Sequence, residues 1–98
     1  MTDLRSIRDL MERARALARG LDLRTPRTDV YQLVLKQLDT IDIALRAGAK
    51  QGFAAARPLS ILAVRELDDM TGDAGELGRE IFRICDGLRQ LAGLPIHD

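Results

Sequence analysis

The sequence predicts an all-α fold: an antiparallel bundle of four helices that forms a single helical domain over residues 1–98. Three observations support this prediction. Apolar residues recur at steps of three and four along most of the chain, glycine and proline interrupt the pattern at short breaks, and no segment shows the sustained apolar–polar alternation of a strand. Helices joined by short breaks pack antiparallel to their neighbours, which gives a bundle.

The first helix is expected to run from Thr2, which can cap it, to Arg19. Gly20 follows, and glycine readily adopts the left-handed conformation that ends many helices. One apolar stripe lies along this segment and should enter the core. It consists of Leu4, Ile7, Met11, Ala14, Leu17 and Ala18.

The second helix is expected to begin near Pro26 and to run to about Ala47, where Gly48 and Gly52 close it. Its stripe consists of Val30, Val34, Leu38, Ile41 and Leu45. Ile43 does not belong to this stripe, because at about 100° per residue it points almost opposite to the stripe.

A connector, Phe53–Pro58, is expected next, with Phe53 anchored in the core. Proline suits the first turn of a helix, so the third helix is predicted from Pro58 to about Met70. Its first turns carry apolar residues on nearly every side and should be central and buried. These residues are Leu59, Ile61, Leu62, Ala63 and Val64.

Gly72 is expected to end the third helix, and Asp73 with Glu76 three residues later resembles a capping box that starts the fourth. Gly93 and Pro95 should stop that helix. Its stripe consists of Leu77, Ile81, Ile84, Leu88 and Leu91, with Phe82 and Cys85 beside it.

Net charge is zero but unevenly distributed, since residues 1–27 carry seven arginines against four acids and residues 59–98 carry four arginines against eight acids. No apolar run approaches the ~20 residues that span a bilayer, and the first residues lack the apolar core of a signal peptide. We therefore expect a cytoplasmic protein without a membrane partner. Cys85 is the single cysteine and His97 the single histidine, which leaves little material for metal or acid–base chemistry.

Two patterns are similar to ligand-binding motifs but lack residues that those motifs require. Gly72, Gly75 and Gly78 lack the preceding strand and the following lysine of a nucleotide loop, so a turn between helices is expected. Asp68, Asp69 and Asp73 do not have the register of a calcium loop. We expect no cofactor and no metal.

The arginines of the first helix alternate with Asp9 and Glu12 and lack interleaved aromatic residues, which predicts a solvated helix face and no nucleic-acid partner. One four-helix family of toxins and RNases uses an arginine followed within six residues by a histidine, and this chain has no such pair. Cys85 is expected to be a small buried side chain. The sequence therefore predicts a binding protein and not an enzyme.

Three consecutive segments resemble a small all-helical family of bacterial immunity proteins from type VI secretion systems. They are LKQLDTIDIAL (Leu35 to Leu45), LSILAVRELDD (Leu59 to Asp69) and GELGREIFRICDGLR (Gly75 to Arg89). The best-known member of the family neutralises a toxin that hydrolyses NAD and NADP. The resemblance covers about residues 30–90 and departs from the family pattern at Ser60 and in the turn MTGDAG, so the identity of the toxin is open.

The resemblance implies an immunity protein that binds a cognate toxin domain and covers its active-site cleft. A cleft that accepts dinucleotide phosphates is electropositive, so an acidic edge could be steered to it. Ile43 is a candidate apolar contact, although it could equally pack on the first helix or on a second copy. The expected toxin interface comprises Asp39, Ile43, Arg65, Glu66, Asp68, Asp69, Asp73 and Glu76.

Two other classes remain open. A secretion chaperone or adaptor would also be a small helical binder without a cofactor, and it should expose an apolar groove for a disordered client. A self-associating structural domain would form a homodimer through a symmetric contact that includes Ile43.

Overall fold

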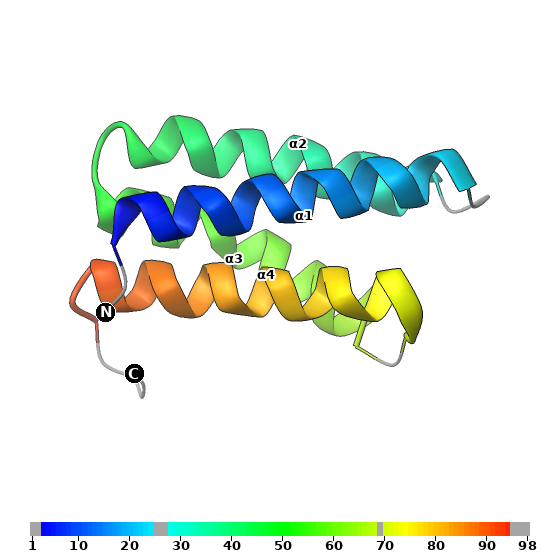
Figure 1. Ribbon diagram of the computed structural model, residues 1–98. Helices are drawn as coiled ribbons and strands as arrows, with labels where there is room; N and C mark the ends of the chain where they lie inside the picture. The colour runs from blue at the N-terminus through cyan, green and yellow to red at the C-terminus, as the bar shows by residue number, and fades with distance from the viewer. Residues whose placement is uncertain (1–2, 25–27, 69, 95–98) are drawn as a thin grey trace.

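The computed structural model describes residues 3–24, 28–68 and 70–94 and contains four helices. The helices run antiparallel to their neighbours and lie side by side (Figure 1), which confirms the predicted all-α bundle. Their bounds are α1 Leu4–Arg24, α2 Thr28–Leu45, α3 Ala49–Glu66 and α4 Gly72–Leu91.

The four helices form a closed ring. α1 packs against α2 and α4, and α3 packs against the same two helices from the opposite side. Among the described residues, no pair of helices makes contact across the diagonal. Each helix therefore presents one face to the core, its two flanks to its neighbours and one outer face to solvent.

The predicted stripes of α2 and α4 enter the core. Val34, Leu38 and Ile41 of α2 are fully buried, as are Ile81 and Ile84 of α4. Burial of each such side chain stabilises the fold by roughly 1.5–3 kcal/mol before the entropy cost of ordering it. The spacing of three and four between apolar residues therefore correctly predicts which faces of α2 and α4 are buried.

The first helix is longer than predicted, because Gly20 does not end it and α1 continues to Arg24. Leu21 lies three residues after the buried Ala18 and is itself buried, so a further turn extends the core stripe. Thr2 lies outside the described residues. The cap is Asp3, whose Oδ1 accepts a hydrogen bond from the Ser6 backbone N–H at 2.8 Å, and this bond lowers the pKa of Asp3.

The predicted connector Phe53–Pro58 is wrong, because this segment is helical and belongs to α3. α2 ends at Leu45, and a short turn leads through Gly48, whose φ of 140° suits glycine, directly into α3. Pro58 lies inside α3 and is exposed. One continuous buried face on both sides of the proline accounts for the longer helix; it consists of Gly52, Ala56, Leu59 and Ala63.

The expectation that the apolar residues from Leu59 to Val64 are all buried is also wrong. Leu59 is fully buried, but Ile61 is 50% exposed and Val64 is 56% exposed. The ring arrangement explains this exposure. Over the described residues, α3 packs only against α2 and α4, so its outer face has no neighbouring helix. Two large apolar side chains are thus left on the outer face of α3.

The turn between α3 and α4 differs from the prediction as well. α3 ends at Glu66, and Gly72, with a φ of 65°, is the first residue of α4 and not the end of α3. The residue that precedes α4 is Thr71, and its side chain makes no capping hydrogen bond. The predicted capping box of Asp73 and Glu76 is therefore wrong, because both residues already lie within the helix.

Candidate functional site

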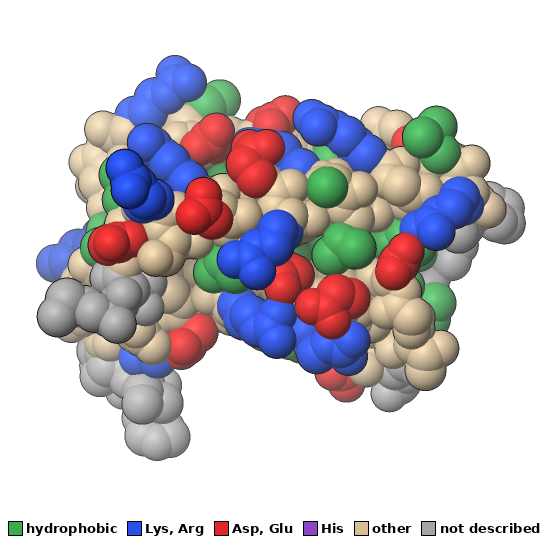
Figure 2. All heavy atoms as spheres, in the orientation of Figure 1, with side chains coloured by type: hydrophobic (Ala, Val, Ile, Leu, Met, Phe, Trp, Pro, Cys, Tyr) green, Lys and Arg blue, Asp and Glu red, His purple; other side chains and the backbone are tan. Residues whose placement is uncertain are grey.

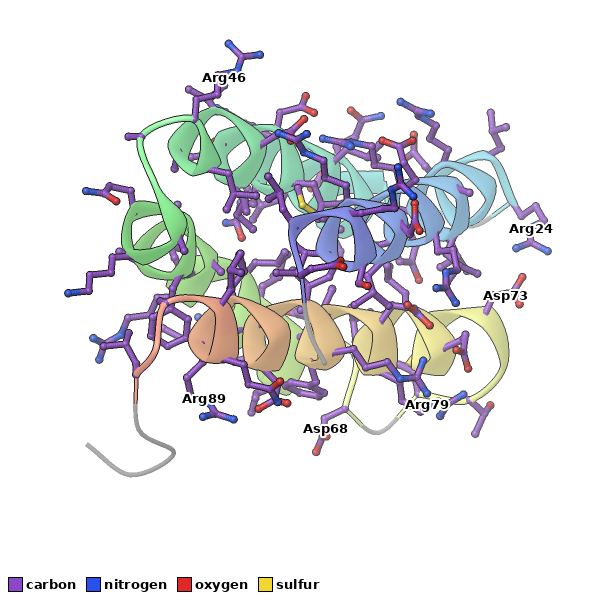
Figure 3. The ribbon with its side chains drawn as sticks, turned by 60° about the vertical axis from the view of Figure 1, so that its left-hand side comes forward. Arg24, Arg46, Asp68, Asp73, Arg79 and Arg89 are labelled. Atoms are coloured by element: carbon purple, nitrogen blue, oxygen red, sulfur yellow. The ribbon has the colours of Figure 1, made fainter. Side chains whose placement is uncertain are left out.

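Four acidic residues lie near the turn between the third and fourth helices, at one end of the bundle. Glu66 ends α3, Asp68 follows it, and Asp73 and Glu76 lie in the first turns of α4. In Figure 3, Asp73 lies at the right end of α4 beside Arg24, and Asp68 lies lower and nearer the middle of the view, pointing away from the bundle. The structure thus brings together four of the predicted interface residues.

Arginines neutralise part of this acidic end. Asp73 pairs with Arg24 at the end of α1, with 2.6 Å between Oδ2 and Nη2 (Figure 3). Glu76 pairs with Arg79 at 2.8 Å and with Arg83 at 3.4 Å. The hydrogen bond from Arg79 lowers the pKa of Glu76 below its ordinary value.

Asp68 is different, since it is exposed and has no ion pair within the described part of the chain. Glu66 is half-buried, and Arg65 is exposed in the last turn of α3. Asp69 lies outside the described residues. The free carboxylate of Asp68 is therefore the group at this end most available to a partner.

Asp39 and Ile43 lie on α2, away from the turn between α3 and α4. Ile43 is 61% exposed near the end of α2, which confirms its position off the buried stripe. Asp39 is bound to Arg15 at 3.2 Å. The predicted interface residues that the structure describes therefore do not form one continuous surface.

Arg15 is a buried charge that the sequence analysis placed on a solvated face. It is 9% exposed, and its guanidinium contacts Glu12 at 2.6 Å and Asp39 and Asp42 of α2 at 3.2 and 3.3 Å. Burial alone lowers the pKa of Arg15, but the three carboxylates outweigh it and raise the pKa above its ordinary value. The position of Arg15 four residues after Met11 and three before Ala18 is the signal that could have found it.

A charged groove of about 450 Å³ lies between α1 and α4. Its lining includes Arg13 and the buried Glu80. One oxygen of Glu80 accepts a hydrogen bond from Arg83 at 2.5 Å, and the other has no partner within the described residues. Figure 2 shows acidic and basic side chains intermixed over this face, without a large patch of one sign. The groove therefore offers no strong field for a charged ligand.

A second pocket, of about 520 Å³, lies between α3 and α4. Phe53 and Ala56 contribute apolar surface, and Lys50 and Arg57 lie at its rim. Cys85 also lines it and is half-buried, as the sequence predicted in part, with Sγ 3.9 Å from the carbonyl oxygen of Ala56. Burial raises the pKa of the Cys85 thiol to about 11, only partly offset by a hydrogen bond with Ser60.

Cys85 is accordingly expected to react slowly with iodoacetamide. A pKa of about 11 in place of 9.0 is a difference of about two units, which lowers the thiolate fraction at pH 8 roughly 100-fold. The rate should be measured on the native protein and on the same protein in concentrated urea, where Cys85 regains its ordinary pKa. Rates within threefold of one another would contradict the assignment of a neutral thiol.

The described residues hold no group of three or more His, Cys, Asp or Glu side chains placed to bind a metal ion. None of the helices, over the residues that the structure describes, is both long and apolar enough to cross a membrane. Comparison with protein families, with curated proteins and with solved structures finds no match to this chain.

Proposed function

We propose that this protein is an immunity protein that binds a cognate secreted antibacterial toxin in the cytoplasm and inhibits it by covering its active-site cleft. The toxin would be of the NAD(P)-hydrolysing class. The observation that carries the proposal is the joint position of Glu66, Asp68, Asp73 and Glu76 near the turn between α3 and α4. The resemblance of residues 30–90 to immunity proteins supports it, since the matched segments fall within α2, α3 and α4 or directly after them.

Charge complementarity would supply the steering and the specificity. A cleft that binds dinucleotide phosphates is electropositive, and opposite charges accelerate association and reject wrong partners. The ion pairs at this end leave the acids available, because exposed pairs such as Asp73–Arg24 contribute only ~0–1 kcal/mol. A toxin arginine can thus replace Arg24 at little cost.

The direct test is to co-express this protein with the product of the adjacent gene and to assay the purified partner for NAD hydrolysis with and without it. We expect a stoichiometric complex in which hydrolysis is abolished. A complex that hydrolyses NAD at the rate of the free partner would contradict inhibition. If no complex forms, the immunity proposal is wrong, and the secretion chaperone becomes the leading alternative.

The contribution of the acidic end can be tested separately with the variant Asp68→Lys, Asp69→Lys. We expect toxin binding to weaken by roughly tenfold or more with unchanged helix content, because two attractive charges become repulsive. Asp9→Lys is the matched control, since Asp9 is an exposed acid of α1 without an ion pair in the described residues. Equal affinity of both variants for the toxin would remove the acidic end from the interface.

A further inference from the structure

The outer face of α3 carries a row of exposed side chains that no contact within the chain explains. Arg57, Ile61 and Val64 lie on α3 at steps of four and three, Asp68 lies in the turn two residues after the end of α3, and all four are exposed. We call this row the α3 seam. The three residues on α3 form one stripe along the helix, like the residues at the contact between two helices of a coiled coil, and Asp68 extends the row beyond the helix end.

The centre of the seam is apolar and its two ends are charged. Ile61 and Val64 leave half or more of their surface exposed. Beside them runs a groove of about 490 Å³ between α2 and α3, which Ile61 shares with Leu33 and Pro58. Neither Arg57 nor Asp68 has an ion pair within the described residues. An apolar centre between two unpaired opposite charges is suited to a partner that presents the same elements in reverse order.

We propose that this partner is a second copy of the chain, which pairs with the first through an antiparallel contact of the two α3 seams. A two-fold axis between Leu62 and Ala63 places Ile61 opposite Val64 of the second copy. The same axis places Arg57 opposite Asp68 of the second copy, on both sides of the contact. Arg57 lies about 8 Å from the axis at 1.5 Å per helical residue, and Asp68 lies on the other side of the axis, in the turn just beyond the end of α3.

The orientation follows from the charges. In a parallel arrangement, Arg57 would face Arg57 of the second copy and Asp68 would face Asp68, and like charges repel. In the antiparallel arrangement both charged pairs are attractive. The apolar centre is covered in either arrangement, so the charges decide between them. Figure 3 shows Asp68, in the turn after α3, pointing away from the bundle, where a neighbour can reach it.

The test is sedimentation equilibrium of the full chain over a range of concentrations. We expect a reversible dimer. Arg57→Glu and Asp68→Lys should each weaken dimerisation by roughly tenfold or more, because each places two like-charge pairs in the contact. The double variant, Arg57→Glu with Asp68→Lys, should restore it. A wild-type protein that stays monomeric, or a charge swap that fails to restore a dimer lost in both single variants, would overturn the proposal.

A matched pair of apolar variants tests the surface itself. Ile61→Glu should abolish the dimer, whereas Ile43→Glu, at a similarly exposed isoleucine of α2, should leave it intact. The opposite result would place the contact on α2 and overturn the proposal. Circular dichroism of each variant checks that the fold is retained.

The proposed dimer does not depend on the proposed toxin. The variants distinguish a failure of the dimer proposal from a failure of the toxin proposal. Arg57→Glu removes the pairing of the seam and keeps Asp68, so it should dissociate the dimer and leave toxin binding at least as tight as in the wild type, because Asp68 is no longer held by the second copy. The charge-swapped double variant should dimerise and still bind the toxin weakly, since its acidic end has lost Asp68.

Discussion

Alanine in place of Gly75 is expected to destabilise the protein by about 2 kcal/mol or more. An added Cβ would lie 2.4 Å from the backbone carbonyl oxygen of Met70, a distance that real Cβ atoms essentially never show. Because the obstacle is backbone, the turn between α3 and α4 must shift, and such overpacking costs about 1–3 kcal/mol. In a domain of this length, 2 kcal/mol lowers Tm by roughly 8–16 °C. Thermal unfolding followed by circular dichroism measures it.

Gly20→Ala is the matched control for this prediction, because it makes the same chemical change in an open position. Gly20 lies inside α1, and its added Cβ would meet nothing closer than the Arg24 guanidinium at 3.6 Å. Alanine favours a helix interior over glycine by roughly 0.5–1 kcal/mol, so this variant should be stabilised. A gain of stability in Gly75→Ala would contradict the close approach of the turn to α4, and a loss in Gly20→Ala would contradict the open position of Gly20.

Leu38→Ala should cost about 3 kcal/mol, within the range of about 2–5 kcal/mol for buried leucine. Leu38 is fully buried in α2, and the facing stripe of α4 cannot move inward to fill the cavity without losing its own contacts. Urea denaturation at one protein concentration should show a lower midpoint with an unchanged slope.

The control for Leu38→Ala is Ile43→Ala, five residues later on the exposed side of the same helix. It should change the free energy of unfolding by less than about 1 kcal/mol, because little apolar surface is lost from the core. Equal effects of the two variants would mean that the faces of α2 are wrongly assigned.

The parts of the fold that depend on local spacing could be predicted from the sequence. The stripes of α2 and α4 are buried as expected, because a continuous 3–4 pattern fixes which face enters the core. The sequence predicts a helix boundary at Pro58, but α3 continues through it. Proline removes one backbone hydrogen bond from a helix. The buried face of α3, which continues from Ala56 to Ala63, stabilises the helix enough to offset this loss.

The features that depend on neighbours could not be predicted. Whether Ile61 is buried depends on how many helices surround α3, and the periodicity of α3 does not contain that information. The burial of Arg15 requires Asp39 and Asp42 of α2 to lie opposite it, which only the packed structure shows. Likewise, the acids near the turn between α3 and α4 looked like one negative edge until Arg24 and Arg79 were placed among them.

The closed ring of helices has a consequence for the connectivity of the chain. With an even number of antiparallel helices, α1 begins where α4 ends, so the two ends of the domain lie at the same end of the bundle (Figure 1). The chain could therefore begin at a different helix while the four helices keep the same arrangement in space. A circular permutant, opened in the exposed turn before Gly48 and joined by a short linker from α4 to α1, retains every pair of neighbouring helices.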